Sequence, residues 1–181
     1  MARTEKEADE YLEIVNHQGE IVGRALRSVC HGHPELIHRV SHVLVFNEAG
    51  LILLQKRSAS KDIQPGKWDS SVGGHLAIGE TFEEAAYREM AEELSIRNVP
   101  IFFLYDYLIR TPMETELVRT FSCCFNGPIF FNEEEIEEVR FWDLYYLHSQ
   151  IETDLFTPHL REEIYRYFSW KKLINRSWEK E

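Results

Sequence analysis

Three glutamates at positions 89, 92 and 93 combine the residue type and the spacing that a metal site needs. Residues three and four apart are neighbours on a helix surface, so Glu89, Glu92 and Glu93 share one face if this stretch is helical. Like charges so placed repel each other, and a divalent cation would relieve that repulsion because hard cations take carboxylate oxygens. A solvated acidic face is the commoner meaning of a glutamate-rich helix. The spacing favours a site for a divalent cation.

The stretch that carries these glutamates is predicted to be a helix. Thr81 is a suitable N-cap, and Glu84 three residues later completes a capping box. No glycine or proline interrupts the chain from there to Leu94, and the composition favours helix. The helical period gathers apolar side chains on the face opposite the carboxylates, so that face is expected to pack on the core. The side chains on it are Ala86, Tyr87, Met90, Ala91 and Leu94.

Two glycines precede this helix in the sequence and are predicted to form a loop that approaches a ligand. Gly73 and Gly74 lack a side chain, so their backbone can come close to a bound group, and a carbonyl there could complete the coordination of a metal. A bulge at the end of a strand is compatible with that role. Arg88 is predicted to pair with Glu80, or with Glu84 one turn back, and to brace the loop without touching substrate.

Composition limits the classes of function that the chain can have. A length of 181 residues suits one domain, and a net charge of −11 argues against nonspecific binding of nucleic acid, which needs a basic surface. No apolar run is long enough to span a membrane. Three cysteines, two of them adjacent, do not form a disulfide framework, which fits a reduced, cytoplasmic setting. The expected partner is a small anionic molecule, and a monomer and a homodimer both remain open.

The order of predicted elements indicates an α/β protein. Residues 1–9 are expected to be a loose tail, and residues 10–181 a single domain. Strands on either side of one central helix, followed by a terminal helix, favour a mixed sheet between helices. The expected strands are 11–15, 21–25, 40–46, 51–55, 69–72, 100–109, 118–125 and 139–142, of which 40–46 and 51–55 are predicted to form a hairpin. The expected helices after 81–94 are 144–150 and 158–173.

The glycines, the glutamates and Arg88 together resemble the Nudix box of the Nudix hydrolases. The residues Gly74, Glu80, Arg88, Glu89, Glu92 and Glu93 fit the pattern G-x5-E-x7-R-E-U-x-E-E-x-G-U, where U is aliphatic. Six specified residues match by chance on the order of once in 10 million starting positions. Ser95 replaces the last glycine of the pattern, a change that concerns the helix end and not the carboxylates.

The resemblance implies a fold and an activity. Nudix proteins have an α/β/α sandwich with a mixed sheet, and they cleave a diphosphate linked to another moiety, often a nucleoside. The resemblance also implies that Glu89, Glu92 and Glu93 hold Mg²⁺, with Mn²⁺ as a possible substitute. Glu92 or Glu93 is the expected catalytic base that accepts a proton from water. A loop glutamate, Glu133, Glu134 or Glu135, is the alternative base, although a solvated charge run is the simpler meaning of that loop.

A second resemblance is to type I isopentenyl diphosphate isomerases, which share the Nudix fold. It covers roughly residues 11–125 and is carried by the stretches 38–46, 55–58, 65–68 and 71–75. Those isomerases place a catalytic cysteine where this chain has Gly73, and glycine cannot deliver a proton to an alkene. The chain is therefore interpreted as a hydrolase in an isomerase-like subgroup, with isomerase activity as the disfavoured alternative.

The isomerase resemblance also implies a second metal site. Those enzymes bind a metal with three histidines and two glutamates, and the matching residues here are His31, His38, His75, Glu114 and Glu116. Imidazole together with carboxylate suits Zn²⁺ or Mn²⁺ better than Mg²⁺. The alternative is that the histidines are hydrogen-bonded loop residues. If a metal binds there, it could orient the diphosphate or a base.

Overall fold

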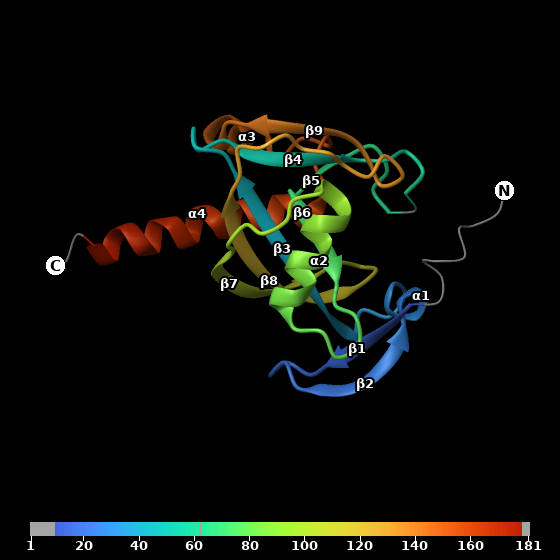
Figure 1. Ribbon diagram of the computed structural model, residues 1–181. Coiled ribbons are helices and arrows are strands. Elements are labelled where there is room, and N and C mark those ends of the chain that lie inside the picture. Colours follow the sequence, from blue (N-terminus) through green and yellow to red (C-terminus); the bar gives the residue numbers. More distant parts are fainter. Residues whose placement is uncertain (1–9, 62, 179–181) are drawn as a thin grey trace.

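The computed structural model describes residues 10–61 and 63–178, and it forms one mixed sheet with helices on both faces (Figure 1). The strands are β1 (Tyr11–Val15), β2 (Ile21–Leu26), β3 (Ile37–Phe46), β4 (Ile52–Arg57), β5 (Trp68–Asp69), β6 (Val72–His75), β7 (Phe102–Arg110), β8 (Thr115–Cys124) and β9 (Ile136–Trp142). The helices are α1 (Arg27–Cys30), α2 (Phe82–Leu94), α3 (Leu144–Gln150) and α4 (Pro158–Trp178). The predicted tail, residues 1–9, lies outside the described residues.

Strand β3 is the centre of the sheet. It pairs in parallel with β8 along its whole length, from Ile37 opposite Thr115 to Phe46 opposite Cys124, and antiparallel with β6. The remaining strand pairs are antiparallel, so the sheet is mixed, as predicted. Because β3 contacts both the glycine strand β6 and the acidic start of β8, it brings segments distant in sequence to one place.

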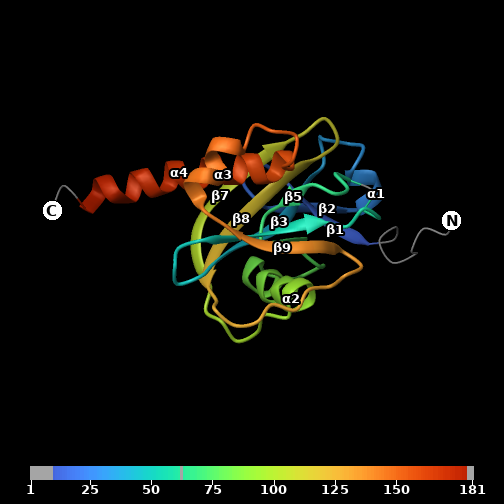
Figure 2. The same cartoon turned by 90° about the horizontal axis from the view of Figure 1, so that it is seen from above.

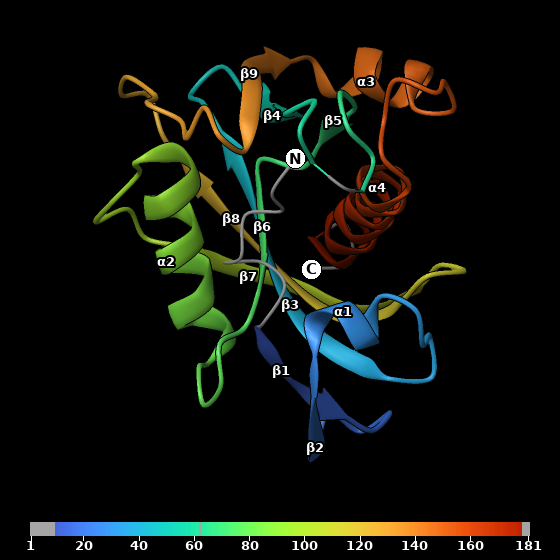
Figure 3. The same cartoon turned by 90° about the vertical axis from the view of Figure 1, so that its right-hand side faces the viewer.

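Helix α2 covers one face of the sheet, and α3 and α4 cover the other (Figures 2 and 3). The predicted α/β/α sandwich is therefore confirmed. Ala86, Met90 and Leu94 of α2 are fully buried against β3 and β8, as the helical period predicts. The helical period predicts Tyr87 on the same face, but this side chain is 44% exposed because it lies at the border of the apolar stripe. On the other face, Leu160 of α4 packs into a separate cluster of buried apolar side chains.

The ends of α2 follow the sequence signals closely. The Thr81 hydroxyl accepts a hydrogen bond from the Glu84 amide at 3.2 Å, and the Glu84 carboxylate accepts one from the Thr81 amide at 2.9 Å. At the other end Ser95 adopts a left-handed conformation, with φ 55° and ψ 22°. Serine therefore occupies the conformation for which glycine is usually preferred, and the helix ends there without moving the carboxylates.

Two local predictions need correction. Residues 40–46 and 51–55 are joined by a turn and pair antiparallel, as predicted, but the pairing is limited to Phe46 and Ile52, and β4 pairs along its length with β9. Gly73 and Gly74 are not in a loop but in strand β6, opposite His42 and Ser41 of β3. Both differences arise because β6 pairs with one edge of β3 and β8 pairs with the other. None of the helices in residues 10–61 and 63–178 has the length and hydrophobicity of a membrane span.

Candidate functional site

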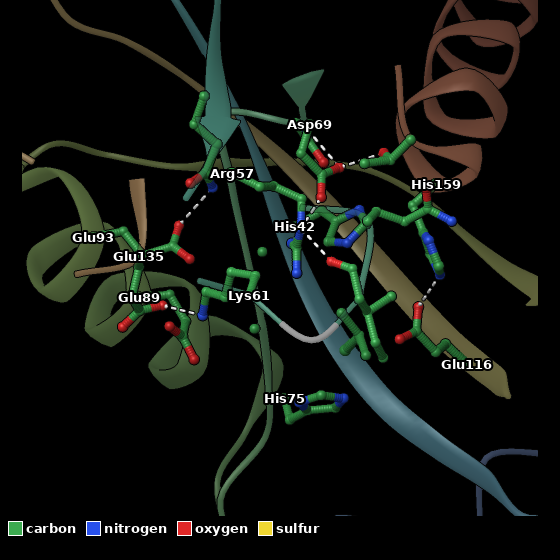
Figure 4. Close-up of a pocket in the computed structure, with 18 of the residues that line it drawn as sticks. His42, Arg57, Lys61, Asp69, His75, Glu89, Glu93, Glu116, Glu135 and His159 are labelled. Carbon is green, nitrogen blue, oxygen red and sulfur yellow. Dashed lines mark hydrogen bonds and ion pairs between the residues drawn. The ribbon is translucent and has the colours of Figure 1, made fainter. Parts of the chain in front are cut away.

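One cavity, about 280 Å³ in volume, is lined by residues from both of the predicted metal-binding sets (Figure 4). Glu89, Glu92 and Glu93 of α2 line one part of it. Residues of the predicted histidine and glutamate set line another part, and these are His31, His75, Glu114 and Glu116. The two sets are distant in sequence, and pairing of β3 with β6 and β8 brings them into one chamber.

The three α2 glutamates differ in burial. Glu93 is 6% exposed and accepts a hydrogen bond from Gln55 Nε2 at 3.0 Å. The Glu89 side chain is 13% exposed, whereas that of Glu92 is 58% exposed. Two carboxylates are thus withdrawn from solvent at the cavity, and the third lies at its rim.

Burial and mutual repulsion make the ionised forms of the inner pair unfavourable. Burial, opposed by the neighbouring Arg88 guanidinium, raises the pKa of Glu89 to about 7. Burial and then the negative charges of Glu89 and Glu135 raise the pKa of Glu93 well above its usual range. Arg88 offsets part of the charge of Glu89, and a bound divalent cation would supply further opposite charge to both carboxylates, so the residues fit a metal.

Arg88 braces the strand β6 and the α2 carboxylates at once. Its Nε and Nη2 atoms donate to both carboxylate oxygens of Glu80, each at 2.9 Å, so the predicted pairing with Glu80 is observed. Nη2 also donates to the His75 carbonyl at 2.9 Å. Nη1 donates to Glu89 at 2.7 Å and to Glu92 at 3.2 Å, contacts that the sequence did not predict. Glu84 is not a partner of Arg88, because it is held in the capping box.

The two glycines of β6 are needed for close approach. A Cβ atom on Gly74 would lie 1.9 Å from Glu89 Oε1, and one on Gly73 would lie 2.9 Å from His42 Cδ2. A side chain at position 74 would therefore displace Glu89. At position 73 there is no room for a cysteine unless the His42 ring moves, so the space of the isomerase thiol is closed.

The predicted histidine and glutamate residues converge. His38 on β3 lies directly opposite Glu116 on β8 in the parallel ladder, and its Nε2 is 3.7 Å from Glu116 Oε1. His75, at the end of β6, has its ring centroid 5.0 Å from that of His38. His31 lies just after α1, and its Nε2 atom is 3.1 Å from Glu114 Oε2. All five residues of this set are thus neighbours in space.

Donor atoms in this cluster are close enough to share a cation. One atom each from His31, His38 and His75 lies within 4.8 Å of the other two, and the same holds for His38, Glu114 and Glu116. Within the described part of the chain, the three α2 glutamates do not form such a group. Nε2 of His75 and Nε2 of His38 are buried without a hydrogen bond. Buried nitrogens of this kind suit a metal ligand, so the donor set fits Zn²⁺ or Mn²⁺.

His159 also belongs to this cluster, and sequence reasoning did not find it. It lies in the first turn of α4, with Nε2 3.2 Å from Glu116 Oε2 and 3.7 Å from Glu114 Oε1 (Figure 4). Burial alone would lower the pKa of His159, but the Glu116 carboxylate and other acidic neighbours raise it to about 9. The sequence feature that could have identified His159 is its spacing from Glu163, four residues later, beside the apolar stripe of α4.

The acidic loop before β9 contributes one residue to the cavity. Glu135 lines it and accepts a hydrogen bond from Lys61 Nζ at 3.0 Å. Glu133 and Glu134 are exposed and are not among the lining residues. Of the three loop glutamates, Glu135 is therefore the one placed to act near Glu89 and Glu93.

Comparisons with known proteins agree with this architecture. The family model described as NUDIX domain matches residues 36–168. A Nudix hydrolase of Yersinia pestis is 35% identical over 130 residues, which cover 72% of this chain and 71% of that protein. Isopentenyl-diphosphate Delta-isomerase 2 of Photorhabdus laumondii is 30% identical over 162 residues, covering 86% and 91%. The crystal structure of DR0079 from Deinococcus radiodurans superposes with a TM-score of 0.77 at 27% identity, covering 87% and 98%.

These matches bear on both resemblances. The family model spans the box, the strands from β3 to β9, and helices α2 and α3. The isomerase relative shows that the likeness to isopentenyl diphosphate isomerases is also present. Together they show that the chain belongs to the Nudix family.

Proposed function

We propose that this protein is a Mg²⁺-dependent hydrolase that cleaves the diphosphate linkage of a nucleoside diphosphate derivative or a related compound. The observation that carries the proposal is the pair of buried carboxylates, Glu89 and Glu93, at the wall of a cavity. Their raised pKa values mean that Arg88, which contacts Glu89, does not offset the cost of burying both charges. A cation together with an anionic diphosphate meets that need.

Each residue of the box has a distinct part in this proposal. Glu89, Glu92 and Glu93 would hold Mg²⁺, which would neutralise the diphosphate and acidify a bound water. Glu92 or Glu93 would accept the proton of the attacking water, with Glu135 as the alternative base. Arg88 keeps Glu89 in place through its 2.7 Å hydrogen bond and does not need to touch substrate.

The nearby histidine and glutamate cluster would hold a second metal, Zn²⁺ or Mn²⁺. His31, His38, His75, Glu114 and Glu116 supply the mixed nitrogen and oxygen donors that these ions take. Because the cluster lines the same cavity as α2, a cation held there would help to orient the diphosphate or its attached group. His159 would hold Glu116 and Glu114 from the α4 side.

Isopentenyl diphosphate isomerisation is the second candidate, and the identity to the Photorhabdus isomerase favours it. That reaction needs a proton donor at the alkene, which those isomerases supply with a cysteine. In this chain Gly73 occupies that position, and the His42 ring closes the space that a side chain would use. The hydrolase is therefore the preferred proposal.

A panel of diphosphate compounds tests both candidates in one experiment. Nucleoside diphosphate derivatives and isopentenyl diphosphate are incubated with the protein and Mg²⁺ in deuterated water, and release of monophosphate and phosphate is measured. We expect hydrolysis of at least one nucleoside compound and no deuterium in isopentenyl diphosphate. Robust deuterium exchange without hydrolysis of any panel member would overturn the proposal.

A further inference from the structure

Glu163 on α4 is a fully buried carboxylate with an unusual number of donors. It accepts hydrogen bonds from Tyr105 and Tyr107 hydroxyls at 2.7 Å each, from Thr120 Oγ1 at 3.0 Å, and is bonded to His42 Nδ1 at 2.8 Å. A buried charge costs much free energy unless it is paired and hydrogen-bonded. A neutral side chain could fill the same space, so the retained charge points to a task for one of its partners.

His42 is the partner that reaches the cavity. It lines the chamber together with Gly73, whereas Glu163, Tyr105 and Tyr107 do not. Its Nδ1 atom is engaged by Glu163, so Nε2 is the nitrogen left for a ligand. A Cβ atom on Gly73 would lie 3.1 Å from Nε2, so the absence of a side chain there leaves this edge of the ring uncovered.

The contacts of His42 favour the charged form of its imidazole at the cavity wall. Burial alone would lower the pKa of His42, but the hydrogen bond and the charge of Glu163 outweigh burial and raise it. Burial would raise the pKa of Glu163, but the His42 contacts and the tyrosine hydroxyls lower it. These shifts favour the ionised form of each residue, in which His42 Nε2–H is a charged donor and Glu163 balances the charge. Two other cations of the wall are already held, Arg57 by Asp69 and Lys61 by Glu135.

The position of His42 is central. Figure 4 draws it between the α2 carboxylates, Glu89 and Glu93, and the pair formed by Glu116 and His159. His42 and both of these groups line the same cavity. Charge-assisted hydrogen bonds to phosphate oxygens are short and strong, and an imidazolium held by a carboxylate is a preorganised donor for one.

We propose that His42 Nε2 binds a non-bridging oxygen of the substrate's diphosphate and that Glu163 is the positioning residue that holds the imidazole for this contact. The identity of the anion rests on the proposed function, but the contact itself does not require hydrolysis. A purely structural pair would tie α4 to β3 and would be indifferent to anions in the cavity.

The test uses methylenediphosphonate, a diphosphate analogue that cannot be hydrolysed, together with Mg²⁺. Its affinity is measured by calorimetry for the unaltered protein and for His42→Asn, whose amide nitrogen can replace Nδ1 at Glu163 but leaves nothing at Nε2. Loss of one charge-assisted hydrogen bond should weaken binding by about 10- to 100-fold. His33→Asn is the matched control, because His33 forms the same kind of pair with Glu35, also at 2.8 Å, but on the surface.

A second measurement covers the case in which His42→Asn does not fold. In the unaltered protein, labelled with ¹⁵N in histidine, the Nε2 resonance of His42 should shift when the analogue is added, and Glu163→Gln should reduce that shift. Unchanged affinity in folded His42→Asn, or an unmoved Nε2 resonance at saturation, would overturn the proposal. Binding with the expected shift, but with no hydrolysis of any panel compound, would support this contact while removing the hydrolase function.

Discussion

Replacement of Glu93 by glutamine is expected to abolish most Mg²⁺-dependent hydrolysis while the protein stays folded. Glutamine keeps the shape and can still pair with Gln55, but it removes one negative charge and one candidate base from the cavity wall. Loss of a positioned base costs about 10²- to 10⁴-fold in rate. Glu89→Gln is expected to act in the same direction through weaker Mg²⁺ binding. Turnover of the panel substrate and Mg²⁺ titration measure the two effects.

Although Glu93→Gln should abolish most activity, it should stabilise the metal-free protein near neutral pH. Because burial raises the pKa of Glu89 to about 7, and that of Glu93 well above its usual range, the folded state binds more protons than the unfolded state. Unfolding free energy therefore falls as the pH rises from about 4.5 to about 7 in the presence of a chelator. Glu93→Gln should flatten that fall.

A matched control lies on the same helix. Glu83 is exposed at the first turn of α2, away from the cavity lining, so Glu83→Gln removes one charge without touching the site. It should retain activity and the pH dependence of stability. Full activity in both Glu89→Gln and Glu93→Gln would exclude the α2 carboxylates as the metal site.

Removal of two histidines from the second cluster is expected to abolish binding of a transition metal. The double variant His38→Ala/His75→Ala deletes the two residues whose ring centroids are 5.0 Å apart at the centre of the cluster. After loading with Zn²⁺ or Mn²⁺ and dialysis, metal analysis should find the ion in the unaltered protein and not in the variant. At a free metal concentration 100 times the dissociation constant, binding should also stabilise the fold by about 2.7 kcal/mol.

The control for this variant is a second pair of histidines. His17→Ala/His33→Ala removes two imidazoles from exposed positions outside the cavity and should leave metal content unchanged. Equal metal content in the cluster variant and the unaltered protein would remove the cluster from consideration. Absence of metal from both the cluster variant and the unaltered protein after reloading would also remove the cluster from consideration.

The local parts of the site could be predicted from the sequence because their signals are local. The capping box at Thr81 and Glu84 predicts where α2 begins, and the chain departs from that helix where Ser95 takes a left-handed conformation. The spacing of the glutamates predicts their common face. Burial of Glu93 and exposure of Glu92 depend on how α2 sits on the sheet, which spacing does not determine.

Long-range features were predicted only where a family resemblance supplied them. His38 and Glu116 meet because β3 and β8 pair in parallel, a contact between strands that no local pattern encodes. His159 and Glu163 were missed because a histidine and a glutamate four apart on a helix suggest a surface ion pair. In the structure both face inward, toward the cluster and toward His42 respectively.

The most direct test of the central claim is hydrolysis of the diphosphate panel by chelated protein before and after Mg²⁺ is restored. We expect no release of phosphate or monophosphate without metal, because nothing at Glu89 and Glu93 would then neutralise the diphosphate or acidify a water. We expect Mg²⁺ to restore turnover of at least one nucleoside compound, and Glu93→Gln not to recover under the same conditions. Undiminished turnover in chelator, or no turnover of any compound with Mg²⁺, would contradict the proposed function.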